Sequence, residues 1–109
     1  MMAGVRPIPK RLLPDEMFVR VPDGCGGFEP PVHVGHVRFE RSQSMVDDEH
    51  RSADAGAGIV YVDAVNSQGA FEVPAGSRVC IDGADMVVAS CKRLCGANGH
   101  VHHWELEVQ

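Results

Sequence analysis

The sequence predicts a mainly β fold: a small antiparallel barrel or sandwich of about six strands, with an extended N-terminal arm and a long polar loop. Short runs of alternating apolar and polar residues recur along the chain, which is the period of a half-buried strand. The 12 glycines and 7 prolines are spread between these runs, where they suit turns. Almost no stretch shows the repeat of an amphipathic helix, so the strands must pack against one another.

Length, composition and charge indicate a single small domain with no membrane segment. The 109 residues suit one domain, and the low aromatic share of 6% predicts a small core of Val, Ile, Leu and Met. The sequence has no apolar run that would cross a bilayer and no signal-peptide core, so we expect no membrane contact and synthesis in the cytoplasm. The formal net charge of −5 argues against a domain that grips DNA phosphates. In that setting the four cysteines are expected to be free thiols.

Residues 1–15 are predicted to form an arm ahead of a single β domain over residues 16–109. Its prolines, Pro7, Pro9 and Pro14, block a regular helix. Positive and apolar residues alternate between them: Arg6, Ile8, Lys10, Arg11, Leu12 and Leu13. Two interpretations stay open, a solvated terminus or a peptide that orders against a partner through Leu12 and Leu13.

The first predicted strand covers residues 16–21 and places Met17, Val19 and Val21 on one face. The glycine-rich loop after it lacks the G-K-[ST] ending of a phosphate-binding loop. A second strand over 32–41 is interrupted by Gly35, which suggests a bulge. Beyond it the inward residues are Val37 and Phe39, and the outward ones are His36, Arg38 and Glu40. We expect His33 and His36 to lie on the surface.

A polar segment over residues 42–58 has no sustained periodicity. It is long for a loop in a compact domain, which favours either a solvated flexible loop or a segment that orders on assembly. Its charged residues include Asp47, Asp48, Glu49, Arg51 and Asp54.

The second half of the chain supplies the remaining strands. A third strand is predicted over 59–64, and residues 79–92 form a hairpin around Asp82-Gly83, a pair that tolerates positive φ. Val79 and Ile81 share one face of its first strand. Its second strand is apolar on both sides, which favours a central position. The last strand turns four residues inward and three outward: His102, Trp104, Leu106 and Val108, against His103, Glu105 and Glu107.

The one cluster with metal-ligating chemistry comprises Cys91, Cys95, His100, His102 and His103. Thiolates and imidazoles are ligands that zinc prefers, but this spacing matches no common zinc finger. Strand alternation also points His102 and His103 to opposite faces, so we expect two strand histidines, no metal site and no cofactor. The sequence contains no G-x-S-x-G motif and no recognisable Ser-His-Asp frame, and we expect no enzymatic activity.

Several of these residues resemble a known family. The arm from Arg6 to Pro14 is similar to the opening of the minor capsid proteins of tailed phages and prophages. The resemblance continues at residues 36–39, 61–63, 66–67 and 79–83, and ends at His102-His103-Trp104-Glu105-Leu106. It spans nearly the whole chain in order. The chain departs from the family pattern at residues 15–18, where His-Thr-Val is common, and at Gly76-Ser77, where Gly-Asp is common.

This resemblance implies a structural virion protein of the head–tail connector, or neck, of the head-completion or stopper type. Such a protein joins the portal-bound adaptor to the tail and helps to close the DNA-filled head. The implied partners are further copies in a ring (a dodecamer), the adaptor, and a tail-side neck or terminator protein. Packaged DNA would pass nearby without sequence-specific binding, and the host would be a bacterium.

On this view the arm is one protein interface, through Ile8, Lys10, Arg11, Leu12 and Leu13. The polar loop with Asp47, Asp48, Glu49, Arg51 and Asp54 would face the channel or a neighbouring subunit, where its acidic character would repel DNA. The alternative is a small stand-alone β-barrel that binds a metal through the Cys/His cluster, or nucleic acid.

Overall fold

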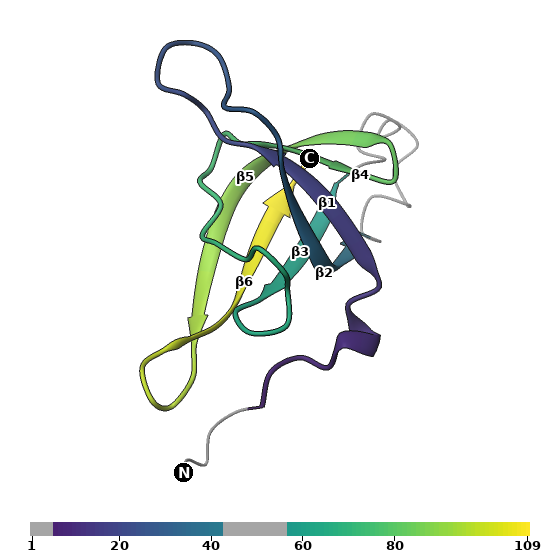
Figure 1. Cartoon of the computed structure of the whole chain (residues 1–109), viewed down its shortest axis with the longest axis vertical. Coiled ribbons are helices and arrows are strands. Elements are labelled where there is room, and N and C mark those ends of the chain that lie inside the picture. The colour runs from purple at the N-terminus through teal and green to yellow at the C-terminus, as the bar shows by residue number, and fades with distance from the viewer. Residues whose placement is uncertain (1–5, 43–56) are drawn as a thin grey trace.

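A computed structural model describes residues 6–42 and 57–109 of the chain. These residues form a closed antiparallel barrel in the order β1-β2-β3-β6-β5-β4 (Figure 1). The predicted mainly β class is confirmed, and of the two architectures the chain adopts the barrel. The elements are η1, a 3-10 turn over Lys10–Leu12, and the strands β1 (Asp15–Arg20), β2 (Val32–Arg41), β3 (Gly58–Asp63), β4 (Arg78–Ile81), β5 (Ala84–Cys95) and β6 (Val101–Val108).

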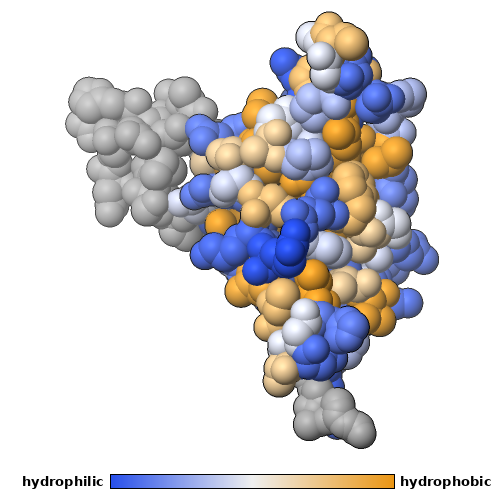
Figure 2. Space-filling view, turned by 90° about the vertical axis from the view of Figure 1, so that its left-hand side faces the viewer, coloured by the Kyte–Doolittle hydropathy of each residue, from blue (hydrophilic) through white to orange (hydrophobic). Residues whose placement is uncertain are grey.

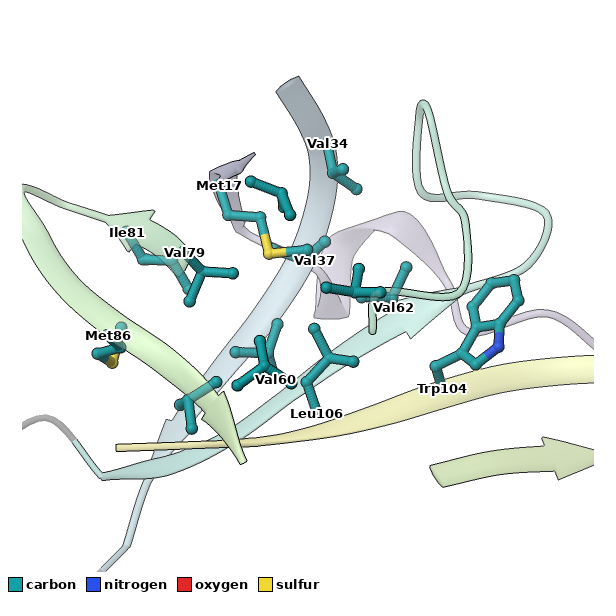
Figure 3. Close-up of a cluster of buried hydrophobic side chains, with 14 residues drawn as sticks. Met17, Val34, Val37, Val60, Val62, Val79, Ile81, Met86, Trp104 and Leu106 are labelled. Atoms are coloured by element: carbon teal, nitrogen blue, oxygen red, sulfur yellow. The ribbon is translucent and has the colours of Figure 1, made fainter. Parts of the chain in front are cut away.

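Closure comes from the pairing of β1 with β4, in which Val19 lies opposite Val79. Every strand then has two hydrogen-bonded neighbours, so the barrel has no exposed sheet edge. Alternate residues point inward and form one core, which also takes in Val73 from the segment before β4. Figure 3 shows these side chains converging from all the strands: Met17, Val34, Val37, Val60, Val62, Val79, Ile81, Met86, Trp104 and Leu106.

The bulge predicted at Gly35 is confirmed. Between the pairs Asp15–Val37 and Met17–Val34, β2 carries one residue more than β1. Gly35 bonds instead to Gln68, whose backbone N–H and C=O each lie 3.0 Å from their partners on Gly35. His36 has φ 55° and its side chain is half-buried, so the expectation of a surface position fails here, whereas His33 is exposed. A bulge re-aims the side chain that it carries, which accounts for the changed position of His36.

The hairpin between β4 and β5 turns at Asp82 and Gly83, which have φ 53° and 80°. Both positive values are those of the tight turn that the sequence predicts. β5 lies between β4 and β6, but only one of its faces is covered. Met86 is 3% exposed, whereas its neighbour Val87 is 41% exposed, because a closed barrel has one interior and no second layer outside it.

Arg93 of β5, the cross-strand partner of Trp104, forms an ion pair with Glu72. Arg93 donates from Nε and Nη2 to the two carboxylate oxygens of Glu72, at 2.8 and 3.0 Å, and Trp104 Nε1 donates to Glu72 at 3.2 Å. These hydrogen bonds, first from Arg93 and then from Trp104, lower the pKa of Glu72. Figure 2 shows this side of the molecule, with a hydrophilic cluster near its middle and hydrophobic residues around it.

The polar segment with Asp47, Asp48, Glu49, Arg51 and Asp54 lies outside the described residues, and its predicted role stays a prediction. At its borders Ser42 N–H donates to Ala57 C=O at 3.0 Å. No helix in the described ranges has the length and apolar character that crossing a membrane requires.

Candidate functional site

The arm is docked along its own barrel by backbone hydrogen bonds. Ile8 N–H donates to Asp63 Oδ1 at 2.9 Å, and Ile8 C=O accepts from Asn66 Nδ2 at 2.8 Å. His102 Nε2 lies 2.6 Å from Arg6 C=O. From Arg6 onward the arm is therefore held by its own chain and is not a free solvated terminus, because partners for its backbone exist in that chain. That the arm also orders against a partner stays a prediction.

Asp63 ends β3 and is the centre of this attachment. Its side chain is fully buried, and its Oδ2 accepts from the N–H groups of Val65 and Asn66 at 2.9 and 2.8 Å. A buried carboxylate needs such donors to replace water. Here three backbone N–H groups supply them, two from its own turn and one from the arm.

Ser67 links the same turn to the bulge in β2. The Ser67 hydroxyl accepts from Asp63 N–H at 2.8 Å and donates to His36 C=O at 2.5 Å. The residues from Asp63 to Ser67 thus fasten the arm on one side and β2 on the other. A local signal for this turn exists in the sequence, since Asp and Asn commonly accept from the backbone two residues on. That signal does not show that the N–H of Ile8 would also donate to Asp63.

His102 and His103 lie together, and the prediction that they face opposite sides is wrong. Their Nδ1 atoms are 2.8 Å apart. In the β5–β6 pairing Leu94 lies opposite His103 and Cys95 opposite Val101, so His102 is an extra residue on β6. A bulge of this kind breaks strict alternation and re-aims a side chain.

The two histidines take part in a series of three close contacts, and the N–H groups that these contacts need can be counted. The series runs from Arg6 C=O through His102 and His103 to Glu105 Oε2, the last step being 3.2 Å. Both ends only accept, so three hydrogen bonds require three N–H groups, whereas two neutral imidazoles carry two.

The turn η1 divides the arm's leucines. Leu12 N–H donates to Pro9 C=O and Leu13 N–H to Lys10 C=O, both at 2.9 Å. This turn buries Leu13, which is 1% exposed, and leaves Leu12 43% exposed. Leu13 is thus already part of its own chain's interior, a correction to its expected role as an anchor for a partner.

Beside the exposed arm residues is a groove of about 340 Å³. It is lined by Ile8, Leu12, Leu13, Arg38, Glu40 and Tyr61. Burial, followed by the negative charges of Glu40 and Glu105, raises the pKa of Tyr61. The groove is therefore lined by apolar side chains and by one charge of each sign, Arg38 and Glu40. Lys10 and Arg11 are exposed and precede Leu12 in the chain. That Ile8, Lys10, Arg11 and Leu12 contact a partner stays a prediction.

The Cys/His cluster does not converge. Within residues 6–42 and 57–109, no three metal-ligating side chains come together. The four cysteines are free thiols, and Cys95 is exposed. Cys91 packs against the core, and burial, followed by the charge of Glu72, raises the pKa of its thiol. A raised pKa disfavours the thiolate that a metal requires.

A second pocket, of about 460 Å³, lies under the arm. Its lining includes Asp15, Glu16, His33 and His36 but no Ser, Thr or Cys. Both acidic groups are engaged in structural contacts: Asp15 accepts from Phe39 N–H at 2.9 Å, and Glu16 lies 2.6 Å from His33. The described lining therefore offers no hydroxyl or thiol nucleophile beside a base, which is one arrangement that covalent catalysis uses.

A comparison with known protein families gave a match. A family model described as "Minor capsid protein" matches residues 9–108 of the chain. No curated protein and no solved structure matches it. The matched range includes the groups that hold the arm, namely Asp63, Asn66 and His102.

Proposed function

The chain belongs to the minor capsid protein family and is a structural component of a phage virion, and from this we propose that it is a head–tail connector subunit. In this role it is of the head-completion or stopper type. Copies form a ring, a dodecamer, in the neck between the portal-bound adaptor and a tail-side neck or terminator protein, and help to retain the packaged DNA. The proposal includes no catalytic step and no cofactor.

The docked arm is the observation that carries the proposal. A subunit that joins two complexes needs distinct surfaces for distinct neighbours. η1 holds Leu12 outward beside an apolar groove and places Lys10 and Arg11 next to it. Because hydrogen bonds to Asp63 and Asn66 fix the backbone of the arm, this surface is preorganised, which lowers the entropy cost of binding.

The other assignments rest on the family alone. The acidic loop residues Asp47, Asp48, Glu49, Arg51 and Asp54 would face the channel or a neighbouring copy. DNA would pass them without sequence-specific binding, since like charge repels phosphate.

Complementation of a phage or prophage that lacks this gene tests the proposal. Without the chain we expect DNA-filled heads that lack tails and lose their DNA, and with it we expect tailed infectious particles. Electron microscopy of purified particles should place the chain in the neck. Tailed, infectious particles formed without the chain, or a chain found elsewhere in the virion, would contradict the proposal.

The role of the arm is tested in the same assay with Leu12→Ser. This change removes the exposed apolar group, and we expect a loss of infectious titre of about tenfold or more if Leu12 is an anchor of the interface. Val65→Ser is the matched control, because Val65 is 71% exposed and does not line the groove. Equal titres for the two variants would contradict a binding role for Leu12.

A further inference from the structure

Two outer faces of the barrel lie on opposite sides of the molecule. The strand order places three strands between the β4/β1 seam and the β3/β6 seam in either direction around the barrel. In a closed barrel this separation is the largest possible. Residues that point outward at one seam therefore face away from those at the other.

The β4/β1 seam carries a basic–aromatic face, defined as Phe18, Arg20, Phe28, Arg78 and Val87. Arg20 and Arg78 are direct cross-strand partners, and their guanidinium carbons lie 5.8 and 5.1 Å from the centre of the Phe28 ring. Phe18 is 48% exposed and Val87 41% exposed. The face thus combines two positive charges with apolar side chains that are open to solvent.

The two arginines have no carboxylate partner within the part of the chain that the structure describes. Arg20 Nε donates to Glu29 C=O at 3.3 Å, but neither guanidinium forms an ion pair there. Both line a pocket of about 330 Å³ that also contains Asp85. Like charges directly opposite each other destabilise a sheet, so a partner that brings carboxylates would relieve this arrangement.

The β3/β6 seam carries an acidic–aromatic face, defined as Glu40, Ile59, Tyr61, Glu105 and Glu107. Ile59 lies opposite Glu107, and Tyr61 opposite Glu105. The Tyr61 hydroxyl donates to Glu40 at 3.2 Å, and Tyr61 lines the 340 Å³ groove beside the arm.

The field around Tyr61 is negative. Arg38 lies 3.6 Å from Glu40 and offsets part of the charge, but two carboxylates, Glu40 and Glu105, act on the phenol against this one guanidinium. The raised pKa of Tyr61 reports the same balance, after the effect of burial.

We infer that the basic–aromatic face of one copy of this chain docks on the acidic–aromatic face of the next copy. The inference rests on the proposed ring and names its contact. Arg20 and Arg78 would meet Glu40 and Glu107, and Phe18 would enter the groove at Tyr61. The contact is head-to-tail, because its two sides are different surfaces of the same chain.

The placement of the faces suits a ring of many copies. In a ring, the two contact faces of a subunit point in nearly opposite directions. They deviate from exact opposition by 360° divided by the number of subunits, which is about 30° for a dodecamer. Faces on opposite seams fit such a ring, and they do not fit a two-fold dimer, in which a patch meets itself. DNA phosphates could also pair with the arginines, but they would leave Phe18 and Val87 without an apolar partner.

Charge reversal tests the contact. One variant carries Arg20→Glu and Arg78→Glu, and the other carries Glu40→Lys and Glu107→Lys. All four positions lie at the surface of the isolated chain, so the fold should persist, which thermal unfolding checks. Ala97→Glu and Ala97→Lys, in the turn after β5, control for added charge. Self-association of the purified full chain is measured by sedimentation velocity.

We expect each reversed variant to associate about tenfold or more weakly than the wild type, because like charges then meet at every contact. An equimolar mixture of the two variants should recover association, since alternating copies again pair opposite charges. The controls should behave as the wild type. This recovery is the decisive result, because general destabilisation of either variant cannot produce it.

Three results would overturn the inference: a wild-type chain that stays monomeric to its solubility limit, reversed variants that associate normally, or a mixture that does not recover. Loss of duplex-DNA binding in the arginine variant alone, with self-association unchanged, would assign the arginines to DNA instead. The neck role itself is tested by a different result from the contact between copies. A chain dispensable for particle assembly would contradict the neck role even if the mixture recovered in solution.

Discussion

At the scale of single residues, Asp63 decides where the arm lies. Its two oxygens accept from three backbone N–H groups, and one of these belongs to Ile8, which is 55 positions away in the chain. Because the carboxylate is fully buried, a replacement that cannot accept at the same points leaves N–H groups without partners. The local turn and the distant arm therefore depend on one side chain.

Asp63→Asn is expected to destabilise the fold by about 1–3 kcal/mol, because the amide NH₂ faces N–H donors. Trypsin should also cut faster after Lys10 and Arg11 in the loosened arm. Urea unfolding and the cleavage rate measure the two effects. Asp85→Asn, at an exposed position, is the control and should change stability by less than about 0.5 kcal/mol. Equal behaviour of the two variants would contradict the role given to Asp63.

The lowered pKa of Glu72 predicts how the stability of the fold depends on pH. Its pKa in the folded chain lies below the ordinary 4.5, chiefly through the hydrogen bond from Arg93. A group with a lowered pKa contributes stability above its unfolded pKa, and that stability is lost as pH falls through the folded value. Between neutral pH and pH below 4.5 the wild type should therefore lose more stability than Glu72→Gln.

Urea unfolding followed by Trp104 fluorescence at the two pH values measures this difference. Glu29→Gln, an exposed position elsewhere on the barrel, should keep the pH dependence of the wild type. Parallel pH profiles for the wild type and Glu72→Gln would show that the ion pair has no linked effect.

At the scale of elements, η1 sorts two adjacent leucines into different roles. Leu13→Ala should cost about 2–4 kcal/mol, because it empties a buried site. Leu12→Ala should change stability by less than about 0.5 kcal/mol, since its side chain is exposed. The midpoint of urea unfolding measures both, and the two variants are matched in position and chemistry. Similar losses at both positions would contradict the burial of Leu13.

The start of β3 has room only for glycine. A Cβ at Gly58 would overlap the backbone oxygen of Glu40 and lie 2.8 Å from Phe39 Cε1. Gly58→Ala should therefore destabilise the β2–β3 pair by about 2 kcal/mol or more. Gly27→Ala is the control, because the nearest atom there, at 3.0 Å, is at the end of the Asp23 side chain. Thermal unfolding compares them, and a neutral Gly58→Ala would contradict the close approach.

At the scale of the whole molecule, closure makes the strands depend on one another. Every strand pairs with two neighbours around a single core, so partial opening of one seam exposes the interior of all. We expect one cooperative unfolding transition, with far-ultraviolet circular dichroism and Trp104 fluorescence changing together. Two separated transitions would show that part of the barrel unfolds independently.

Assembly also belongs to this scale. The isolated chain leaves Leu12 partly exposed beside the arm groove, and Phe18 and Val87 partly exposed on the basic–aromatic face. Such positions are ordinary when they stand alone, but here each lies beside charged residues, in the groove at Leu12 and on the basic–aromatic face. They are the positions at which neighbouring copies or neck proteins would complete the structure.

The sequence by itself determined the strands and, except at the bulges with His36 and His102, their inward faces, because these depend on an alternation that is visible over a few neighbouring residues. It also determined the turn at Asp82-Gly83 and the bulge at Gly35, since both follow from local backbone chemistry. The family resemblance, carried by short motifs in order along the chain, agrees with the matched family model.

Only the tertiary structure decided between barrel and sandwich, docked the arm and brought His102 beside His103. The bond from His102 to Arg6 joins residues 96 positions apart, and closure depends on the register between β1 and β4. No local pattern encodes such contacts, because they form only when the whole chain has folded and the buried groups find the partners that water no longer supplies.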